Sequence, residues 1–145
     1  MTFPELAVTG YLPLDLVTRE DFMAANLRAI QEIAKVTKGI TAVVGYVSKD
    51  ATGEIFNSAC VLRDGETIHT YNKILLPNYG VFDEKRFFSP LKDPSIVTLH
   101  DTPTAVSICE DIWWANGPTI VQAQAGAKII LSLNASPMYV GKIED

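Results

Sequence analysis

Hydrophobic side chains along this chain follow two different periods, which predict helices in some places and strands in others. After Thr18 and Asp21, a pair typical of a capping box, apolar residues recur at steps of three and four as far as Gly39. This spacing predicts an amphipathic helix that begins near Thr18. A second, shorter helix is expected over residues 119–125, because Gly126 is a typical helix-ending residue.

Short β-branched and apolar runs, separated by turn residues, predict the strands. These runs are residues 41–47, 55–63, 66–72, 95–99, 104–108 and 128–134. The Asp64-Gly65 pair between two of them is typical of a tight hairpin turn. Strands and helices alternate without a repeat or a linker, so we expect one α/β domain over residues 1–145.

Composition excludes several functional classes. The 145 residues carry a net charge of −5 with scattered Lys and Arg, which argues against a nucleic-acid partner. No apolar run reaches the ~18 residues of a membrane span, and the N-terminus lacks a signal-like segment, so we expect a cytoplasmic protein without a membrane partner. Two cysteines without a CxxC or Cys-His cluster predict neither a disulfide framework nor a metal site.

One of these cysteines, Cys109, is placed where a nucleophile would be. It follows the apolar run 104–108 and precedes two carboxylates, Glu110 and Asp111. A side chain at such a strand-to-turn junction is exposed at the edge of a sheet while the strand behind it fixes its position. The alternative is that Cys109 is a small buried hydrophobic residue. That packing role is the expectation for Cys60, which lies inside the run 55–63.

Two charged residues in apolar surroundings are candidate partners for Cys109. Glu5 is either a solvated loop residue or a general base, and Lys73 directly follows the run 66–72, where an ammonium can be held at a sheet edge. A thiol needs a base, and a reacting carbonyl needs a cation as it becomes an oxyanion. A cysteine–histidine pair is the rival arrangement, but we expect both histidines, His69 and His100, to be structural.

Three separated segments carry a family resemblance. They are Phe3-Pro4-Glu5-Leu6, the run from Tyr71-Asn72-Lys73 to Phe88, and Cys109-Glu110-Asp111-Ile112-Trp113. In this order they resemble the nitrilase (carbon–nitrogen hydrolase) superfamily. Within this superfamily, the segments are most similar to those of the glutaminase domain of glutamine-dependent NAD synthetases. Two further stretches are also shared with that domain: Leu76-Pro-Asn-Tyr-Gly-Val-Phe-Asp-Glu84, and Asn134-Ala-Ser136-Pro137 followed by Gly141-Lys142.

The resemblance implies roles for individual residues. Glu5 would be the general base, Lys73 the oxyanion-stabilising cation and Cys109 the nucleophile. Supporting positions would be Glu84, an additional glutamate near the lysine, and Glu110, whose backbone N–H would be the second oxyanion donor. The positions that bind glutamine in these relatives are Tyr79, Ser136 and Lys142.

The same resemblance implies a reaction and its partners. Glutamine would be hydrolysed through a thioester, and the ammonia would serve NAD synthesis by a synthetase domain or subunit. We expect that domain to be absent from this chain; ATP, Mg and deamido-NAD would belong to it, whereas the glutaminase reaction would need no cofactor. Two alternatives stay open: a stand-alone amidase acting on another small amide, or an inactive fragment that serves as an interaction module.

The implied fold is a four-layer α-β-β-α sandwich. We expect it to be incomplete, because family members carry further elements before the Phe3 segment and after the Ser136 segment. Sheet edges exposed in this way invite association, and we therefore expect a homo-oligomer.

Overall fold

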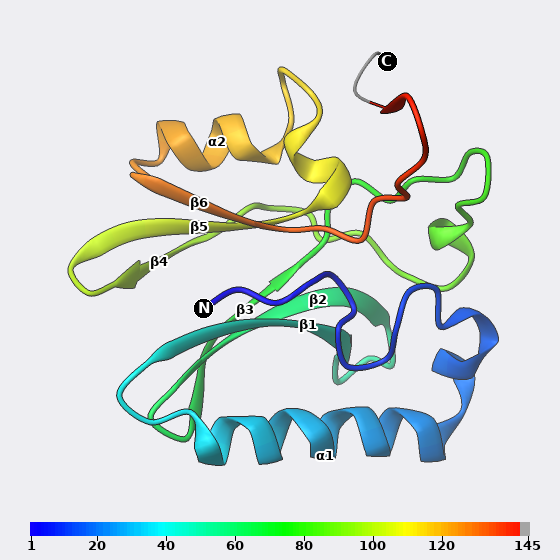
Figure 1. Cartoon of the computed structure of the whole chain (residues 1–145), viewed down its shortest axis with the longest axis horizontal. Coiled ribbons are helices and arrows are strands. Elements are labelled where there is room, and N and C mark those ends of the chain that lie inside the picture. The colour runs from blue at the N-terminus through cyan, green and yellow to red at the C-terminus, as the bar shows by residue number, and fades with distance from the viewer. Residues whose placement is uncertain (143–145) are drawn as a thin grey trace.

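The computed structural model describes residues 1–142 as four stacked layers of helix, sheet, sheet and helix. The outer layers are the helices α1 (Glu20–Val36) and α2 (Pro118–Gln124). One sheet has the order β1 (Thr41–Lys49), β2 (Ile55–Arg63), β3 (Glu66–Asn72), and the other β4 (Ile96–Leu99), β5 (Thr102–Ile108), β6 (Ile129–Leu133). Short 3-10 turns are η1 (Leu14–Thr18), η2 (Glu84–Arg86) and η3 (Cys109–Ile112). Figure 1 shows this α-β-β-α order, which confirms the expected fold class.

The two sheets are connected differently. Strands β1, β2 and β3 form an antiparallel meander, and the β2–β3 turn has positive φ at both Asp64 (50°) and Gly65 (96°), as a tight hairpin requires. Strand β5 pairs antiparallel with β4 but parallel with β6, so α2 is the crossover between two parallel strands. Gln122 ties this helix to the sheet, because its side-chain amide nitrogen, Nε2, donates to the Val106 carbonyl at 2.9 Å.

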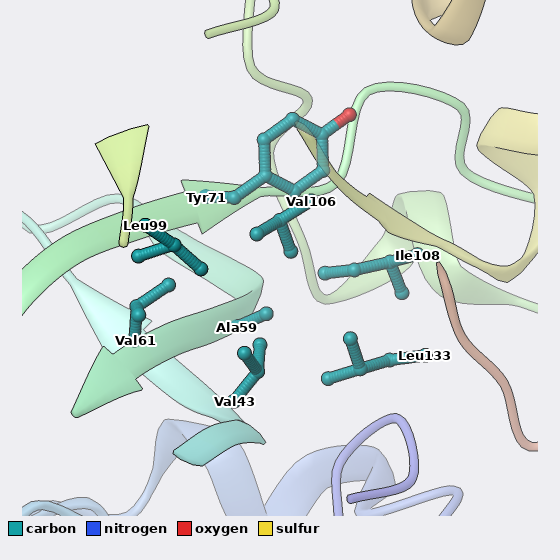
Figure 2. Packing of buried hydrophobic residues seen from close by; sticks show 8 residues of the cluster. All are labelled: Val43, Ala59, Val61, Tyr71, Leu99, Val106, Ile108 and Leu133. Carbon is teal, nitrogen blue, oxygen red and sulfur yellow. The ribbon is translucent and has the colours of Figure 1, made fainter. Parts of the chain in front are cut away.

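Strands β1 and β2 are apolar on both faces because each face is covered. Alternate residues point in opposite directions along a strand. Val43 and Val61 therefore face the second sheet, whereas their neighbours Val44 and Cys60 face α1. The cluster between the sheets, shown in Figure 2, consists of Val43, Ala59, Val61, Tyr71, Leu99, Val106, Ile108 and Leu133. Cys60 is 0% exposed, which confirms its packing role.

Helix α1 and strand β5 begin about two residues away from their predicted starts. Helix α1 begins at Glu20, and Thr18 is not its cap: the Thr18 hydroxyl donates to the Asp15 carbonyl at 2.7 Å within η1. Because the Thr18 hydroxyl is bonded within this preceding turn, it does not cap the first turn of α1. Strand β5 begins at Thr102 and includes Pro103, because proline is tolerated near the start of a strand.

The N-terminal segment lies directly against β1, and a glycine makes this approach possible. Phe3 N donates to the Val43 carbonyl at 2.8 Å, and Val8 N donates to the Gly45 carbonyl at 3.2 Å. A Cβ atom on Gly45 would lie 2.3 Å from the Pro4 carbonyl oxygen and 2.5 Å from Leu6 N. These are backbone atoms, so the whole segment from Pro4 to Leu6 would have to shift.

A Gly45→Ala variant is therefore expected to be less stable by about 1–3 kcal/mol, the usual cost of overpacking a close contact. Urea denaturation would measure the loss. A variant with wild-type stability would show instead that the N-terminal segment moves away from β1 without cost.

Candidate active site

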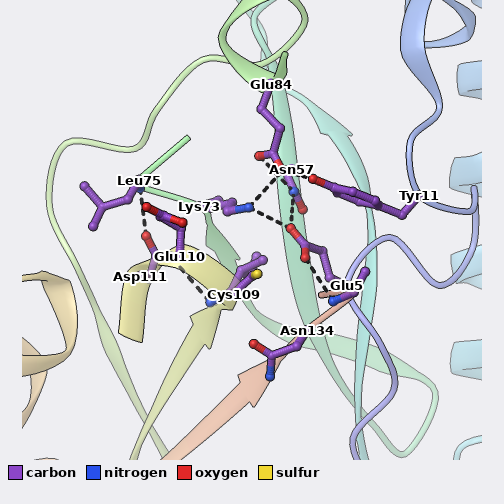
Figure 3. Close-up of polar contacts among 12 residues, drawn as sticks. Glu5, Tyr11, Asn57, Lys73, Leu75, Glu84, Cys109, Glu110, Asp111 and Asn134 are labelled. Atoms are coloured by element: carbon purple, nitrogen blue, oxygen red, sulfur yellow. Dashed lines mark hydrogen bonds and ion pairs between the residues drawn. The ribbon is translucent and has the colours of Figure 1, made fainter. Parts of the chain in front are cut away.

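Lys73 is a buried cation between two carboxylates. It follows β3, where its backbone N–H donates to the Asn57 carbonyl at 2.8 Å, and its side chain is 0% exposed. Lys73 Nζ donates to Glu5 Oε1 at 2.7 Å and to Glu84 Oε1 at 2.9 Å, as Figure 3 shows. Burial acts to lower the pKa of Lys73, but the two carboxylates outweigh burial and raise that pKa. The ammonium therefore stays charged at neutral pH.

Glu5 is held by several partners at once and is only 2% exposed. Besides Lys73, its Oε1 accepts from Asn57 Nδ2 at 2.8 Å, and its Oε2 accepts from the Ala135 backbone N–H at 3.2 Å. The next residue, Leu6, has a φ of 49°, a left-handed conformation that non-glycine residues rarely adopt. Of the two sequence interpretations, a solvated loop residue is excluded by this burial.

Glu84 is the second carboxylate of the cluster. It begins η2 and is buried; Tyr11 OH donates to its Oε1 at 2.8 Å, and Asn57 Nδ2 approaches its Oε2 at 3.4 Å. Burial raises the pKa of Glu84, while Lys73 opposes that rise. Sequence reasoning found neither Tyr11 nor Asn57, although an asparagine inside an apolar strand is a usable signal.

Cys109 lies where β5 turns into η3. Its φ of 46° is again left-handed, so the chain bends sharply at this residue, as it does at the nucleophile elbows of other enzymes. The thiol is partly exposed, and its Sγ lies 3.5 Å from Ser136 Oγ. Burial raises the pKa of Cys109, and the charges of Glu5 and Glu84 add to the rise, while Ser136 and Lys73 oppose it. The resting group is therefore a thiol that needs a base.

Asp111 joins the elbow to the segment that carries Lys73. Its fully buried carboxylate accepts hydrogen bonds from Tyr71 OH (2.9 Å), Leu75 N (2.7 Å), Ile74 N (3.2 Å) and Ile108 N (3.4 Å). One carboxylate thus bridges the end of β3 and the end of β5. This bridge holds the positions of Lys73 and Cys109 relative to each other.

Tyr79 and Glu110 border a cavity next to this cluster. Tyr79 OH donates to Glu110 Oε2 at 2.7 Å, and Trp114 Nε1 donates to Glu110 Oε1 at 3.0 Å. Burial and Glu110 raise the pKa of Tyr79 to about 12. The cavity has a volume of about 650 Å³ and is lined by Ile74, Leu75, Leu76, Pro77, Asn78, Tyr79, Lys85, Phe88, Pro90, Glu110 and Trp114. Its size suits a small ligand, and it adjoins the charged cluster without including Lys73 or Cys109.

The remaining predicted residues lie after β6. Ser136 is brought to the Cys109 thiol, as described above. Lys142 lies further along, where its Nζ donates to the Pro137 carbonyl and sits 5.9 Å from the centre of the Tyr139 ring. The structure therefore unites Glu5, Lys73, Glu84, Cys109 and Ser136, with Tyr79 and Glu110 at the neighbouring cavity.

Both histidines have partners elsewhere. His69 Nε2 lies 3.2 Å from Ser95 Oγ, and His100 Nε2 lies 3.4 Å from Thr41 Oγ1. Burial lowers the pKa of His69. Within residues 1–142, no cluster of three or more His, Cys, Asp or Glu side chains is arranged to hold a metal ion, and no helix is long and apolar enough to cross a membrane.

Comparison of the sequence with known proteins finds relatives of one family. The sequence model of the carbon-nitrogen hydrolase family matches residues 1–144. A glutamine-dependent NAD(+) synthetase of Xanthomonas campestris is 46% identical over 142 residues, which are 97% of this chain and 25% of that protein. The corresponding enzyme of Thermotoga maritima is 40% identical over 145 residues, again covering 25% of that protein. This chain thus spans about a quarter of the length of these relatives.

Solved structures agree with the sequence matches. The glutamine-dependent NAD+ synthetase of Acinetobacter baumannii in complex with ADP superimposes with a TM-score of 0.91 at 38% identity, covering 99% of this chain and 27% of that chain. A nitrilase-superfamily amidase from Nesterenkonia AN1 has a TM-score of 0.79 at 23% identity, covering 98% of this chain and 54% of that chain, and so shares the fold. On its sequence, its layers and these matches, the chain belongs to the carbon–nitrogen hydrolase family.

Proposed function

We propose that this chain hydrolyses the side-chain amide of glutamine, with Cys109 as nucleophile, Lys73 as oxyanion-stabilising cation and Glu5 as general base. The observation that carries the proposal is the buried Glu5–Lys73–Glu84 cluster, whose charges act on the Cys109 thiol. A base and a permanent cation beside a protonated thiol suit acyl transfer. The glutamine-dependent relatives support glutamine as the amide.

The first half of the reaction forms a thioester. Glu5 takes the thiol proton as Cys109 Sγ attacks the amide carbon, and the carbonyl oxygen becomes an oxyanion beside Lys73 Nζ and the backbone N–H of Glu110. The oxyanion then collapses, the carbon–nitrogen bond breaks, and the leaving nitrogen takes the proton from Glu5. Ammonia departs, and the glutamyl group stays on sulfur.

The second half releases glutamate. Water gives a proton to Glu5 while its oxygen attacks the thioester carbon, and Lys73 again balances the oxyanion. The carbon–sulfur bond breaks, and the leaving sulfur recovers the proton from Glu5. Both halves use the same three groups and consume no cofactor.

Substrate recognition would use the residues near the thiol. Ser136 adjoins Cys109, and Tyr79 borders the 650 Å³ cavity. Lys142 would exchange its bond to the Pro137 carbonyl for the α-carboxylate of glutamine, which is a stronger, charge-assisted partner. The ammonia would then pass to a synthetase domain or subunit, which would use ATP, Mg and deamido-NAD.

Covalent labelling tests this assignment. A diazo-ketone analogue of glutamine is expected to add once, at Cys109, and glutamine is expected to slow the reaction. Cys60 should stay unmodified, because it is fully buried and burial raises the pKa of its thiol to about 12. Mass spectrometry of the digested full chain locates the adduct. Equal labelling of both cysteines, or of neither, would contradict the assignment.

A second candidate is hydrolysis of a different small amide. It is favoured by the bonds that Tyr79 and Lys142 make to protein atoms, since both residues would have to turn toward glutamine. Comparing kcat/KM for glutamine with that for propionamide distinguishes the two substrates. A preference for propionamide would move the function to this second class while leaving the roles of Cys109, Lys73 and Glu5 in place.

A further inference from the structure

Asn57 contacts every charged member of the cluster. It lies on β2, is 0% exposed, and its backbone carbonyl accepts from Lys73 N at 2.8 Å. Its Nδ2 donates to Glu5 Oε1 at 2.8 Å and approaches Glu84 Oε2 at 3.4 Å. Figure 3 shows the Asn57 amide between the two carboxylates. Within residues 1–142, the hydrogen bonds of its side chain go to these two carboxylates.

The orientation of this amide is set by the carboxylates. Asn57 Oδ1 has no hydrogen-bond partner among residues 1–142. Turning the amide over would give Oδ1 the place of Nδ2, so that an oxygen would face both carboxylates. An unpaired buried acceptor inside an apolar strand is unfavourable, so a leucine of similar size would serve the strand better. The role of this asparagine therefore lies in the hydrogen bonds from its Nδ2 to the Glu5 and Glu84 carboxylates.

We propose that Asn57 is a positioning residue, which fixes Glu5 and Glu84 around Lys73 and keeps the Glu5 carboxylate directed at the thiol. This inference rests on the proposed hydrolysis for its effect on catalysis. The charged and titratable groups that surround the amide are Glu5 from the N-terminal segment, Lys73 after β3 and Glu84 from η2, with Tyr11 and Cys109 beyond them.

The proposal predicts a kinetic change in an Asn57→Leu variant. We expect kcat for glutamine to fall about 10- to 100-fold, the size of one lost hydrogen bond to a charged group, with KM little changed. The acid limb of the kcat/KM profile should move to higher pH, because carboxylates without an N–H donor are protonated more easily. Wild-type kcat and an unmoved acid limb would overturn the proposal.

A second measurement does not depend on activity. An N–H donor stabilises the ionised carboxylates of the folded chain, and that contribution is present at higher pH and lost as the carboxylates become protonated. The urea midpoint of Asn57→Leu should therefore fall further below wild type at about pH 8 than at about pH 5. If Asn57 only fills space in the strand, the urea midpoint of Asn57→Leu should equal or exceed that of wild type, and the difference should not change with pH.

Asn26 provides a matched control. It is also a buried asparagine, but its Nδ2 donates at 2.6 Å to the Val47 carbonyl, a main-chain group without charge. Asn26→Leu should lower the midpoint equally at both pH values and leave the acid limb in place. If it reproduces the pH dependence of Asn57→Leu, the proposal fails. If the wild-type chain does not hydrolyse glutamine, the proposed function fails, while the pH-dependent midpoint still tests Asn57.

Discussion

Replacing Lys73 by methionine is expected to remove activity and to lower the free energy of unfolding by about 3–5 kcal/mol. Lys73 Nζ is the cation between Glu5 and Glu84, which are both buried. Without the ammonium, two carboxylates would share an enclosed site and one would have to take up a proton. Urea denaturation measures the loss of stability, and ammonia release measures the loss of activity.

Two further variants distinguish the loss of a buried lysine from the loss of any lysine. Lys35 forms an exposed ion pair with Glu32 at 2.6 Å, and Lys35→Met is expected to change stability by less than about 0.5 kcal/mol, as exposed pairs usually do. Adding Glu84→Gln to Lys73→Met removes one stranded carboxylate and should restore part of the stability but none of the activity. A Lys73→Met variant as stable as Lys35→Met would contradict the role of this buried cation.

The second large effect is expected at the thiol. Cys109→Ala should reduce glutamine hydrolysis by at least about 10⁴-fold, because the other thiol that could form a thioester, Cys60, is fully buried. Glutamine binding, measured by isothermal titration calorimetry, should persist, since the residues proposed to bind the substrate are unchanged. The variant should also remain folded, as Cys109 is only partly buried.

Cys60→Ala is the control for this substitution. It changes the other cysteine, which lies on β2 and packs against α1. We expect this variant to be less stable than wild type but to hydrolyse glutamine at a similar rate. Turnover by Cys109→Ala within about a hundredfold of wild type would show that another nucleophile carries the reaction.

Much of the fold follows from local patterns. The two strands 55–63 and 66–72 lie where the sequence predicts them, because an Asp-Gly turn separates two apolar runs of β-branched residues. The start of α1 does not, because Thr18 and Asp15 form a local turn that competes with the capping box. Local patterns distinguish helix from strand, but they do not show whether Thr18 caps the helix or closes the turn before it.

The site is less accessible to sequence reasoning because its contacts are distant along the chain. Lys73 and Cys109 are recognisable as polar residues at strand ends and Glu5 as a charged residue in apolar surroundings, and the structure brings the three together. Asn57 and Tyr11 have carboxylate partners that are 52 and 73 residues away, respectively, so no local pattern pairs them. Asn57 is detectable only as a polar residue inside a buried strand.

The hydrogen bond from Ala135 N to Glu5 joins positions 130 residues apart. Closing such a long separation costs more chain entropy than local pairing does, so this contact is expected only after both sheets have formed. An intermediate with only the β1–β3 sheet would contain Glu5 and Lys73 but no elbow at Cys109. On the proposed mechanism, the thiol and its base would therefore meet only once both sheets are in place.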